Sequence, residues 1–152
     1  MTVRVDVVVV GAGAMGSATA WRLAEAGRHV ALLERFGPGH DRGSSHGATR
    51  IFRVAYRDAR YVRLAERALP LWRELEDRSG QVLLEQVGQL DHGHGAAVDQ
   101  IEQHLVAAGR RAERMSPAAA GERWPGMRFD EAVVFSPDGG RCWAERTVTA
   151  AC

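Results

Sequence analysis

Lysine is absent from this sequence: all twenty of its basic residues are arginine. Any reaction that needs a lysine amine must therefore draw it from outside these 152 residues. Nineteen acidic residues balance the arginines to a formal net charge of +1. This balance gives no electrostatic basis for binding nucleic acid or an anionic membrane surface, so we expect neither as a partner.

Cysteine and long apolar runs are also scarce. Cys142 and Cys152 form neither a zinc-binding spacing nor a disulfide framework, and we interpret both as reduced thiols. The longest apolar run, Val7–Val10 with the small residues after it, is too short to span a bilayer. The start, Met1–Arg4, leads directly into a strand and does not resemble a signal peptide. We therefore expect a cytoplasmic location. We also expect no metal site, because the two histidines of His92-Gly93-His94 have no further candidate ligands nearby in the sequence.

A glycine motif between two predicted strands is the most informative feature that is present. The run Val7–Val10 leads into Gly11-Ala12-Gly13-Ala14-Met15-Gly16, an apolar helix pattern follows, and a second strand ends at Glu34. In a dinucleotide fingerprint the first glycine allows the tight turn, the second lets the backbone approach a pyrophosphate, and the third lets helix and strand pack closely. Glu34 stands where an acid accepts hydrogen bonds from a ribose. The motif predicts dinucleotide binding.

The remaining elements are predicted from hydrophobic spacing and from turn residues. Pro70 should kink the helix at 59–78 or divide it in two. The residues that this helix should bury on one face are Tyr61, Leu64, Ala65, Ala68, Leu71, Trp72 and Leu75. A long loop occupies 35–50, and Ser116 should cap a helix that begins at the following proline. The other predicted elements are a strand at 3–10 buried on both faces, a helix at 14–27, a strand at 29–34, short strands at 82–84 and 89–90, a helix at 96–108 that ends at Gly109, a hairpin at 131–143 and a helix from 144.

A second polar constellation follows the second strand. The segment 43–53 reads Gly-Ser-Ser-His-Gly-Ala-Thr-Arg-Ile-Phe-Arg, so Arg50 and Arg53 stand three residues apart with hydroxyls and His46 just upstream. The segment leaves the carboxyl end of a sheet strand, which is where open α/β folds bind ligands. The planar guanidinium suits a carboxylate because it donates two parallel hydrogen bonds. Solvated arginines on a linker explain the composition equally well.

Together, the glycine motif, Glu34-Arg35-Phe36 and the segment 43–53 resemble the family of monomeric sarcosine oxidase and N-methyltryptophan oxidase. The similarity continues through Leu71–Glu76, Val87–Leu90 and the Pro137–Gly140 turn, more loosely beyond about residue 92. The resemblance implies an FAD-dependent oxidoreductase that oxidises the C–N bond of a secondary amine or N-methyl amino acid such as sarcosine. The imine then hydrolyses, and O2 reoxidises the flavin to give hydrogen peroxide.

The resemblance also implies roles for individual residues. Catalytic or substrate-binding roles fall to Arg53, which would pair with the substrate carboxylate, and to Arg50, His46 and Thr49 beside the flavin ring. The implied FAD-binding residues are Gly11, Gly13, Met15, Gly16, Glu34, Arg35, Gly43, Ser44, Ser45 and Arg50. Two positions depart from the family pattern: Ala48 stands where an acid is frequent, and Ser45 replaces a histidine of some members.

The expected fold class is α/β: the N-terminal βαβ unit of a Rossmann-like FAD-binding domain, with the beginning of an α+β substrate domain. We expect the first part of the FAD-binding domain at 1–85, part of the substrate domain at 86–143 and a return to the FAD-binding domain at 144–152. An open parallel sheet needs four to six strands and only two are clear, so we expect the front part of a longer protein. Its C-terminal half would complete the fold, and the 152 residues alone would be inactive. Two alternatives stay open: an NAD-dependent dehydrogenase, and a non-catalytic dinucleotide-binding remnant.

Overall fold

The computed structural model describes residues 3–37 and 39–151 and divides the chain into two compact units. Unit 1 comprises the described residues of Met1–Arg50, Glu74–Leu83 and Cys142–Cys152, and unit 2 comprises Ile51–Arg73 and Leu84–Arg141. Each unit is considered by itself below. Of the two cysteines, Cys152 lies outside the described residues, so its interpretation as a thiol stays a prediction.

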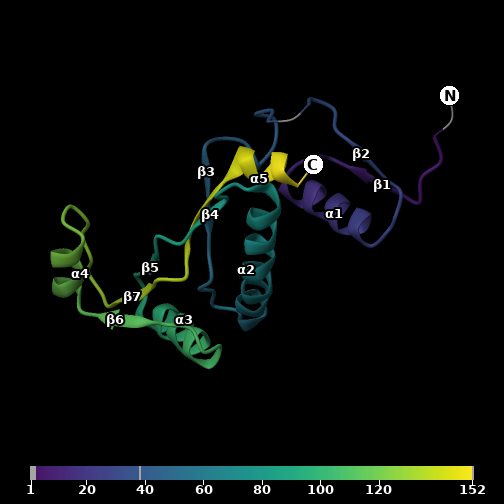
Figure 1. The fold of residues 1–152 in the computed structure, drawn as a ribbon. Coiled ribbons are helices and arrows are strands. Elements are labelled where there is room, and N and C mark those ends of the chain that lie inside the picture. The colour runs from purple at the N-terminus through teal and green to yellow at the C-terminus, as the bar shows by residue number, and fades with distance from the viewer. Residues whose placement is uncertain (1–2, 38, 152) are drawn as a thin grey trace. The chain divides into compact units, whose positions relative to one another are not determined.

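Five helices and eight strands are assigned in the described residues, and Figure 1 labels most of them. The helices are α1 (Ala14–Glu25), α2 (Ala59–Ser79), α3 (Gly95–Ala107), α4 (Pro117–Arg123) and α5 (Ala144–Ala150). The strands are β1 (Val7–Val10), β2 (Val30–Leu33), β3 (Thr49–Phe52), β4 (Leu84–Glu85), β5 (Gln89–Asp91), β6 (Glu113–Met115), β7 (Val133–Ser136) and β8 (Gly140–Trp143).

Unit 1 contains the predicted βαβ motif. Strands β1 and β2 pair in parallel, with Val7 opposite Val30 and Val10 opposite Leu33, and α1 connects them and packs on both (Figure 1). Gly27 follows the end of α1 with φ 76°, a left-handed conformation that glycine adopts without strain. The chain therefore turns directly from helix to strand, and Glu34 comes to lie at the carboxyl end of β2.

The prediction that the first strand is buried on both faces is wrong. Val7 and Val9 are half-buried, whereas Val8 and Val10 are exposed, Val10 with 82% of its surface accessible. The strand is also shorter than predicted, beginning at Val7 rather than at residue 3. The physical reason is that α1 packs on one face of the β1–β2 sheet, while no described element of unit 1 covers the side chains of Val8 and Val10.

Unit 2 is built around an antiparallel sheet with the strand order β5-β7-β6. Gln89 lies opposite Ser136 and Asp91 opposite Val134, and both β7 valines are fully buried. Helix α3 packs on β7 and buries Val98, Ile101 and Leu105. The caps follow the sequence prediction: Ser116 Oγ accepts a hydrogen bond from Ala119 N at the start of α4, and Gly109 has a positive φ after α3.

Helix α2 corrects two further predictions. It runs without interruption from Ala59 to Ser79, so the division at Pro70 is wrong. The predicted buried stripe is confirmed at Ala65 and Leu75, which are buried, and wrong at Tyr61, Leu64 and Leu71, which are exposed. Figure 1 shows α2 as one continuous helix.

The predicted hairpin at 131–143 does not form. Its two strands exist as β7 and β8, but β7 pairs with β5 and β6, whereas β8 belongs to a sheet with the order β3-β8-β4. Strands β3 and β6 were not predicted, and β3 begins within the predicted loop 35–50. Among the described residues no helix is long and apolar enough to cross a membrane.

Candidate functional site

The glycine loop between β1 and α1 approaches the helix more closely than any side chain would allow. A Cβ atom added to Gly16 would lie 1.7 Å from the carbonyl oxygen of Gly11. Gly11 itself has φ 98°, which favours glycine strongly. Gly11 and Gly16 thus have the packing roles that the sequence motif predicts for them.

The N-terminus of α1 faces the loop that follows β2. Ser45 Oγ accepts a hydrogen bond from the N–H of Ala14 at 3.0 Å, which satisfies one of the helix's unpaired donors. The N–H groups of Met15 and Gly16 also belong to the first turn, so they have no acceptor within the helix. Such donors and the positive end of the helix dipole together bind anions, phosphates in particular.

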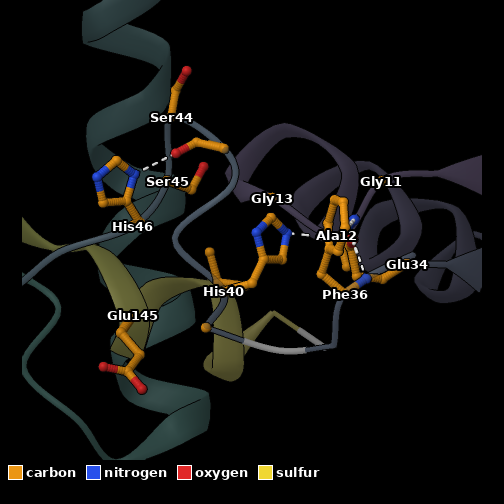
Figure 2. Close-up of a pocket in the computed structure, with 13 residues that line it drawn as sticks. Gly11, Ala12, Gly13, Glu34, Phe36, His40, Ser44, Ser45, His46 and Glu145 are labelled. Carbon is orange, nitrogen blue, oxygen red and sulfur yellow. Dashed lines mark hydrogen bonds and ion pairs between the residues drawn. The ribbon is translucent and has the colours of Figure 1, made fainter.

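Glu34 joins the end of β2 to the glycine loop. Its Oε2 accepts from the N–H of Ala12 at 2.8 Å, its Oε1 accepts from the N–H of Phe36 at 3.0 Å, and His40 Nε2 lies 3.3 Å from Oε1. Figure 2 shows the ring of His40 beside this carboxylate. The bonds from Ala12 and Phe36 outweigh the effect of burial and lower the pKa of Glu34 to about 2. The carboxylate therefore stays ionised and keeps its acceptor oxygens in place.

These groups surround a cavity of about 230 Å3 in unit 1 (Figure 2). The volume lies below the roughly 300–1,000 Å3 of typical ligand pockets, so it accommodates part of a dinucleotide. The lining includes seven residues that the sequence predicted, namely Gly11, Gly13, Glu34, Gly43, Ser44, Ser45 and His46. It also includes six that were not predicted: Ala12, Phe36, Gly39, His40, Glu145 and Val148.

The six unpredicted lining residues differ in whether the sequence carries a signal for them. Phe36 and His40 lie in the loop that leaves β2, and their nearness to Glu34 in the sequence is a usable signal. Glu145 and Val148 come from α5, more than a hundred residues later in the chain. Only the fold brings α5 against α1, so no local pattern indicated these two.

The segment 43–50 is held in shape by hydrogen bonds from its own side chains. Arg50 donates from Nε to the carbonyl of Ser44 at 2.9 Å and from Nη1 to the carbonyl of Thr49 at 2.7 Å. His46 Nδ1 contacts the carbonyl of Gly43. Arg50 and Thr49 do not line the cavity, and their contacts fix the shape of the loop that does.

Two other predicted cofactor-binding residues also lie outside the cavity lining. Met15 occupies the first turn of α1, and its side chain is largely exposed. The guanidinium of Arg35 lies 5.1 Å from the centre of the Phe36 ring. Phe36 itself lines the cavity. The N–H of Met15 has no acceptor within the helix and so is available to a cofactor phosphate.

Arg53 belongs to unit 2 and directly follows β3. Its Nη2 donates to Oδ1 of Asp91 at 2.8 Å, and its guanidinium lies 5.6 Å from the centre of the Tyr56 ring. Arg53 lines two cavities of unit 2, of about 350 and 310 Å3. Its side chain is 46% exposed, so it is accessible to a small anion.

The remaining candidate groups show no comparable arrangement. Among residues 3–37 and 39–151, no group of three or more His, Cys, Asp or Glu side chains could hold a metal ion. Cys142 is a buried free thiol, and burial raises its pKa above the ordinary value. A buried thiol with a raised pKa is a poor nucleophile.

Comparison with known families decides what this arrangement is. Residues 6–151 match the model of the FAD dependent oxidoreductase family. The chain belongs to this family. The family match decides between the two cofactors that the glycine motif left open: FAD is confirmed, and the NAD-dependent dehydrogenase alternative is wrong.

Individual members of the family show the same relationship. The chain is 37% identical over 152 residues to a putative sarcosine oxidase of Caenorhabditis elegans and 35% identical over 156 residues to monomeric sarcosine oxidase of Bacillus sp. (strain B-0618). Each alignment covers 99% of this chain and 40% of the relative. A structure of NikD, an unusual amino acid oxidase essential for nikkomycin biosynthesis, superposes with a TM-score of 0.81 and 32% identity over 99% of this chain and 40% of that one.

These findings confirm the predicted α/β class and the resemblance to sarcosine oxidases. The chain spans about 40% of the length of the curated relatives it matches. The residues of unit 1 fit the cofactor of the family, because the Gly11–Gly16 contact, the open first-turn donors and the ionised Glu34 together suit a pyrophosphate and a ribose.

Proposed function

We propose that the chain contributes the N-terminal part of an FAD-dependent enzyme that oxidises the C–N bond of a secondary amine or N-methyl amino acid such as sarcosine. The products are an imine, which hydrolyses, and hydrogen peroxide from O2. The observation that supports this proposal most strongly is the match to sarcosine oxidases over 99% of the chain, with the glycine loop and Glu34 arranged around one cavity.

We assign the adenosine and pyrophosphate side of FAD to unit 1. Glu34 would accept hydrogen bonds from the ribose, and backbone N–H groups of the Gly11–Gly16 loop would hold the pyrophosphate. Arg35 would flank the adenosine side next to Glu34, and Gly43, Ser44 and Ser45 would line the path toward the flavin. These roles are consistent with the cavity lining and with the Ser45–Ala14 hydrogen bond.

We assign the reacting end to the residues that follow. The bound flavin would supply the acceptor for the hydride that leaves the substrate carbon. Arg53 would bind the substrate carboxylate through the donors that Asp91 does not use. Arg50, His46 and Thr49 would lie by the flavin ring, where a nearby cation favours the reduced, anionic flavin.

Three further parts of the proposal concern the whole protein. We propose that the FAD-binding domain includes residues 1–85 and 144–152 and the substrate domain residues 86–143, that the protein is cytoplasmic, and that a C-terminal half completes the fold. The two sarcosine oxidases compared above are each about two and a half times as long as their alignment with this chain, which supports the last point. We therefore expect no peroxide from sarcosine when the 152 residues are assayed alone, and a peroxide-coupled dye assay tests this.

The decisive experiment is a cofactor titration of the purified 152-residue chain. FAD, FMN and NAD are each added, and thermal unfolding is followed together with the quenching of flavin fluorescence. We expect FAD to raise the unfolding temperature, since a ligand at about 100 times its Kd stabilises the folded state by about 2.7 kcal/mol. NAD should have no effect at the same concentration.

A matched variant makes the test specific. Glu34→Gln removes the charge that would accept the ribose hydroxyls, so the affinity for FAD should fall, whereas any binding of FMN, which lacks the adenosine, should be unaffected. His94→Gln, at an exposed position of unit 2, serves as the control. Equal responses to FAD and NAD, or no response to FAD, would contradict the proposal.

A further inference from the structure

Arg53 is anchored on one side and open on the other. Its Nη2 donates to Asp91 Oδ1, and for Nε and Nη1 no acceptor is found in the part of the chain that the structure describes. A guanidinium carries five N–H donors in a fixed planar fork. Nη2 shares one edge of that plane with Nε and another with Nη1, so whichever Nη2 hydrogen Asp91 accepts, one edge keeps two parallel donors that can meet both oxygens of a carboxylate.

Asp91 is itself held from the other side. It lies on β5 opposite Val134, in the sheet of unit 2, and only 7% of its surface is exposed. Gln89 Nε2 donates to its Oδ2 at 2.7 Å, and Gln89 Oε1 accepts from the N–H of Val54 at 3.2 Å. The bond from Val54 N–H fixes which end of the amide faces Asp91. Each oxygen of the buried carboxylate thus has a defined donor.

The electrostatics of the Asp91 carboxylate bear on the role of its pairing with Arg53. Burial raises the pKa of Asp91, and Arg53 and Gln89 oppose that effect. A buried ion pair is weak evidence for stability, because desolvation offsets the attraction between the charges. Asp91, however, fixes a long side chain that would otherwise rotate freely between two cavities, and such fixing matters for recognition.

We propose that Asp91 is a positioning residue for Arg53: its buried carboxylate holds one side of the guanidinium, so that the remaining donors are presented together to the carboxylate of an amino-acid substrate. This inference rests on the proposed role of Arg53. Gln89 takes part by holding Asp91. Nothing in the glycine motif or in the segment 43–53 indicated either residue, because the contact joins positions 38 residues apart.

The test compares two substitutions that remove the same charge. Asp91→Asn keeps the size of the side chain and an acceptor for Arg53, whereas Asp91→Leu keeps a similar size and removes the acceptor. Acetate is titrated into the 152-residue chain, with acetamide as the neutral control, and binding is followed by the Arg53 Nε–H NMR signal. Since both variants lose one negative charge near Arg53, any electrostatic gain for acetate cancels in the comparison.

We expect Asp91→Leu to bind acetate about fivefold more weakly than Asp91→Asn, on the scale of immobilising one long side chain. Asp99→Asn, on the surface of α3, is the matched control, because it removes a charge from unit 2 without touching the Arg53–Asp91–Gln89 network. Equal affinities in the two Asp91 variants would overturn the inference. A wild-type chain that shows no saturable acetate shift at Arg53 would overturn the role of Arg53 as well, while the FAD titration would still stand as a separate test.

A measurement on the unmodified chain covers the case in which Asp91→Leu does not fold. The order parameter of the Arg53 Nε–H vector from NMR relaxation should exceed about 0.6, the upper limit for flexible groups, without any ligand. Arg67, an exposed arginine on α2 for which no ion pair or hydrogen bond is found in the described residues, gives the reference for a mobile arginine. An Arg53 as mobile as Arg67 would overturn the inference.

Discussion

Glu34 carries the clearest pH dependence among single residues of unit 1. Its folded-state pKa is lowered from 4.5 to about 2 by the N–H groups of Ala12 and Phe36, so the folded state binds fewer protons than the unfolded state between these values. The resulting stabilisation is fully present above pH 4.5 and is lost as the pH falls toward 2. Glu34→Gln should therefore flatten the fall in the urea unfolding midpoint between pH 5.5 and 3. Asp41→Asn, at an exposed loop position, should leave that fall unchanged, and parallel curves for wild type and Glu34→Gln would contradict the assignment.

Gly16 is a position at which adding a single methyl group should lower the stability of the fold. Because a Cβ there would overlap the carbonyl oxygen of Gly11, Gly16→Ala must move the helix or the loop, at a cost of about 1–3 kcal/mol in the free energy of unfolding. Gly121→Ala is the matched control, since its Cβ would meet nothing within 4 Å in α4 and alanine is the better helix former by roughly 0.5–1 kcal/mol. Chemical denaturation should show opposite signs for the two variants. A stabilised Gly16→Ala would contradict the close contact.

Single residues also mark the limit of what the sequence could predict. Gly11, Gly16 and Glu34 were identifiable because their roles depend on neighbours within one βαβ unit. Glu145 and Asp91 were not, because Glu145 reaches the cavity from a distant helix and Asp91 is placed by the pairing of a sheet. Their residue types gave no signal that separated them from solvated charges.

At the scale of elements, local signals predicted helices better than strand partners. Ser116 and Gly109 fixed helix ends through bonds to adjacent residues, so α3 and α4 were found close to their observed bounds. The turn at Ser136–Gly140 predicted a hairpin, but β7 already pairs with β5 and β6 on its two edges. A strand can pair with any strand edge that the fold brings beside it, whereas a turn motif predicts only pairing with the next strand along the chain.

Pro70 provides a test at this scale. It lies inside the uninterrupted helix α2 and is exposed, so it removes a backbone hydrogen bond and crowds the preceding turn without a packing role of its own. Pro70→Ala should stabilise the chain by about 1–3 kcal/mol in chemical denaturation and raise its helical circular dichroism. Pro117→Ala, at the first position of α4 where proline is tolerated, should change stability by much less. Equal effects of the two substitutions would contradict this account.

At the scale of the whole molecule, the apolar surface of unit 1 determines behaviour in solution. Val8, Val10 and Leu33 on the paired strands β1 and β2 each have more than half of their surface exposed. Exposed apolar strand residues beside an open sheet edge favour pairing with other chains. We expect concentration-dependent self-association of the 152-residue chain, measurable by sedimentation velocity.

The substitution Val10→Thr should reduce this association, because threonine keeps the branched shape of valine while making the surface polar. Val106→Thr serves as the control, since Val106 is also exposed but lies on helix α3 of unit 2. If both substitutions reduce association equally, the β1–β2 surface is not its origin. The sequence predicted fewer strands than an open parallel sheet needs, but it did not predict that Val8 and Val10 would be exposed.

The hydrogen bond between Ala12 and Glu34 has a consequence for the kinetics of cofactor uptake. It joins residues 22 positions apart and sets the glycine loop against the end of β2 without any ligand. A site formed in advance needs no slow rearrangement on encounter, so association should proceed at a rate set by diffusion and orientation. Variants that keep this hydrogen bond should then differ from one another in how long the cofactor stays bound, and very little in how fast it arrives.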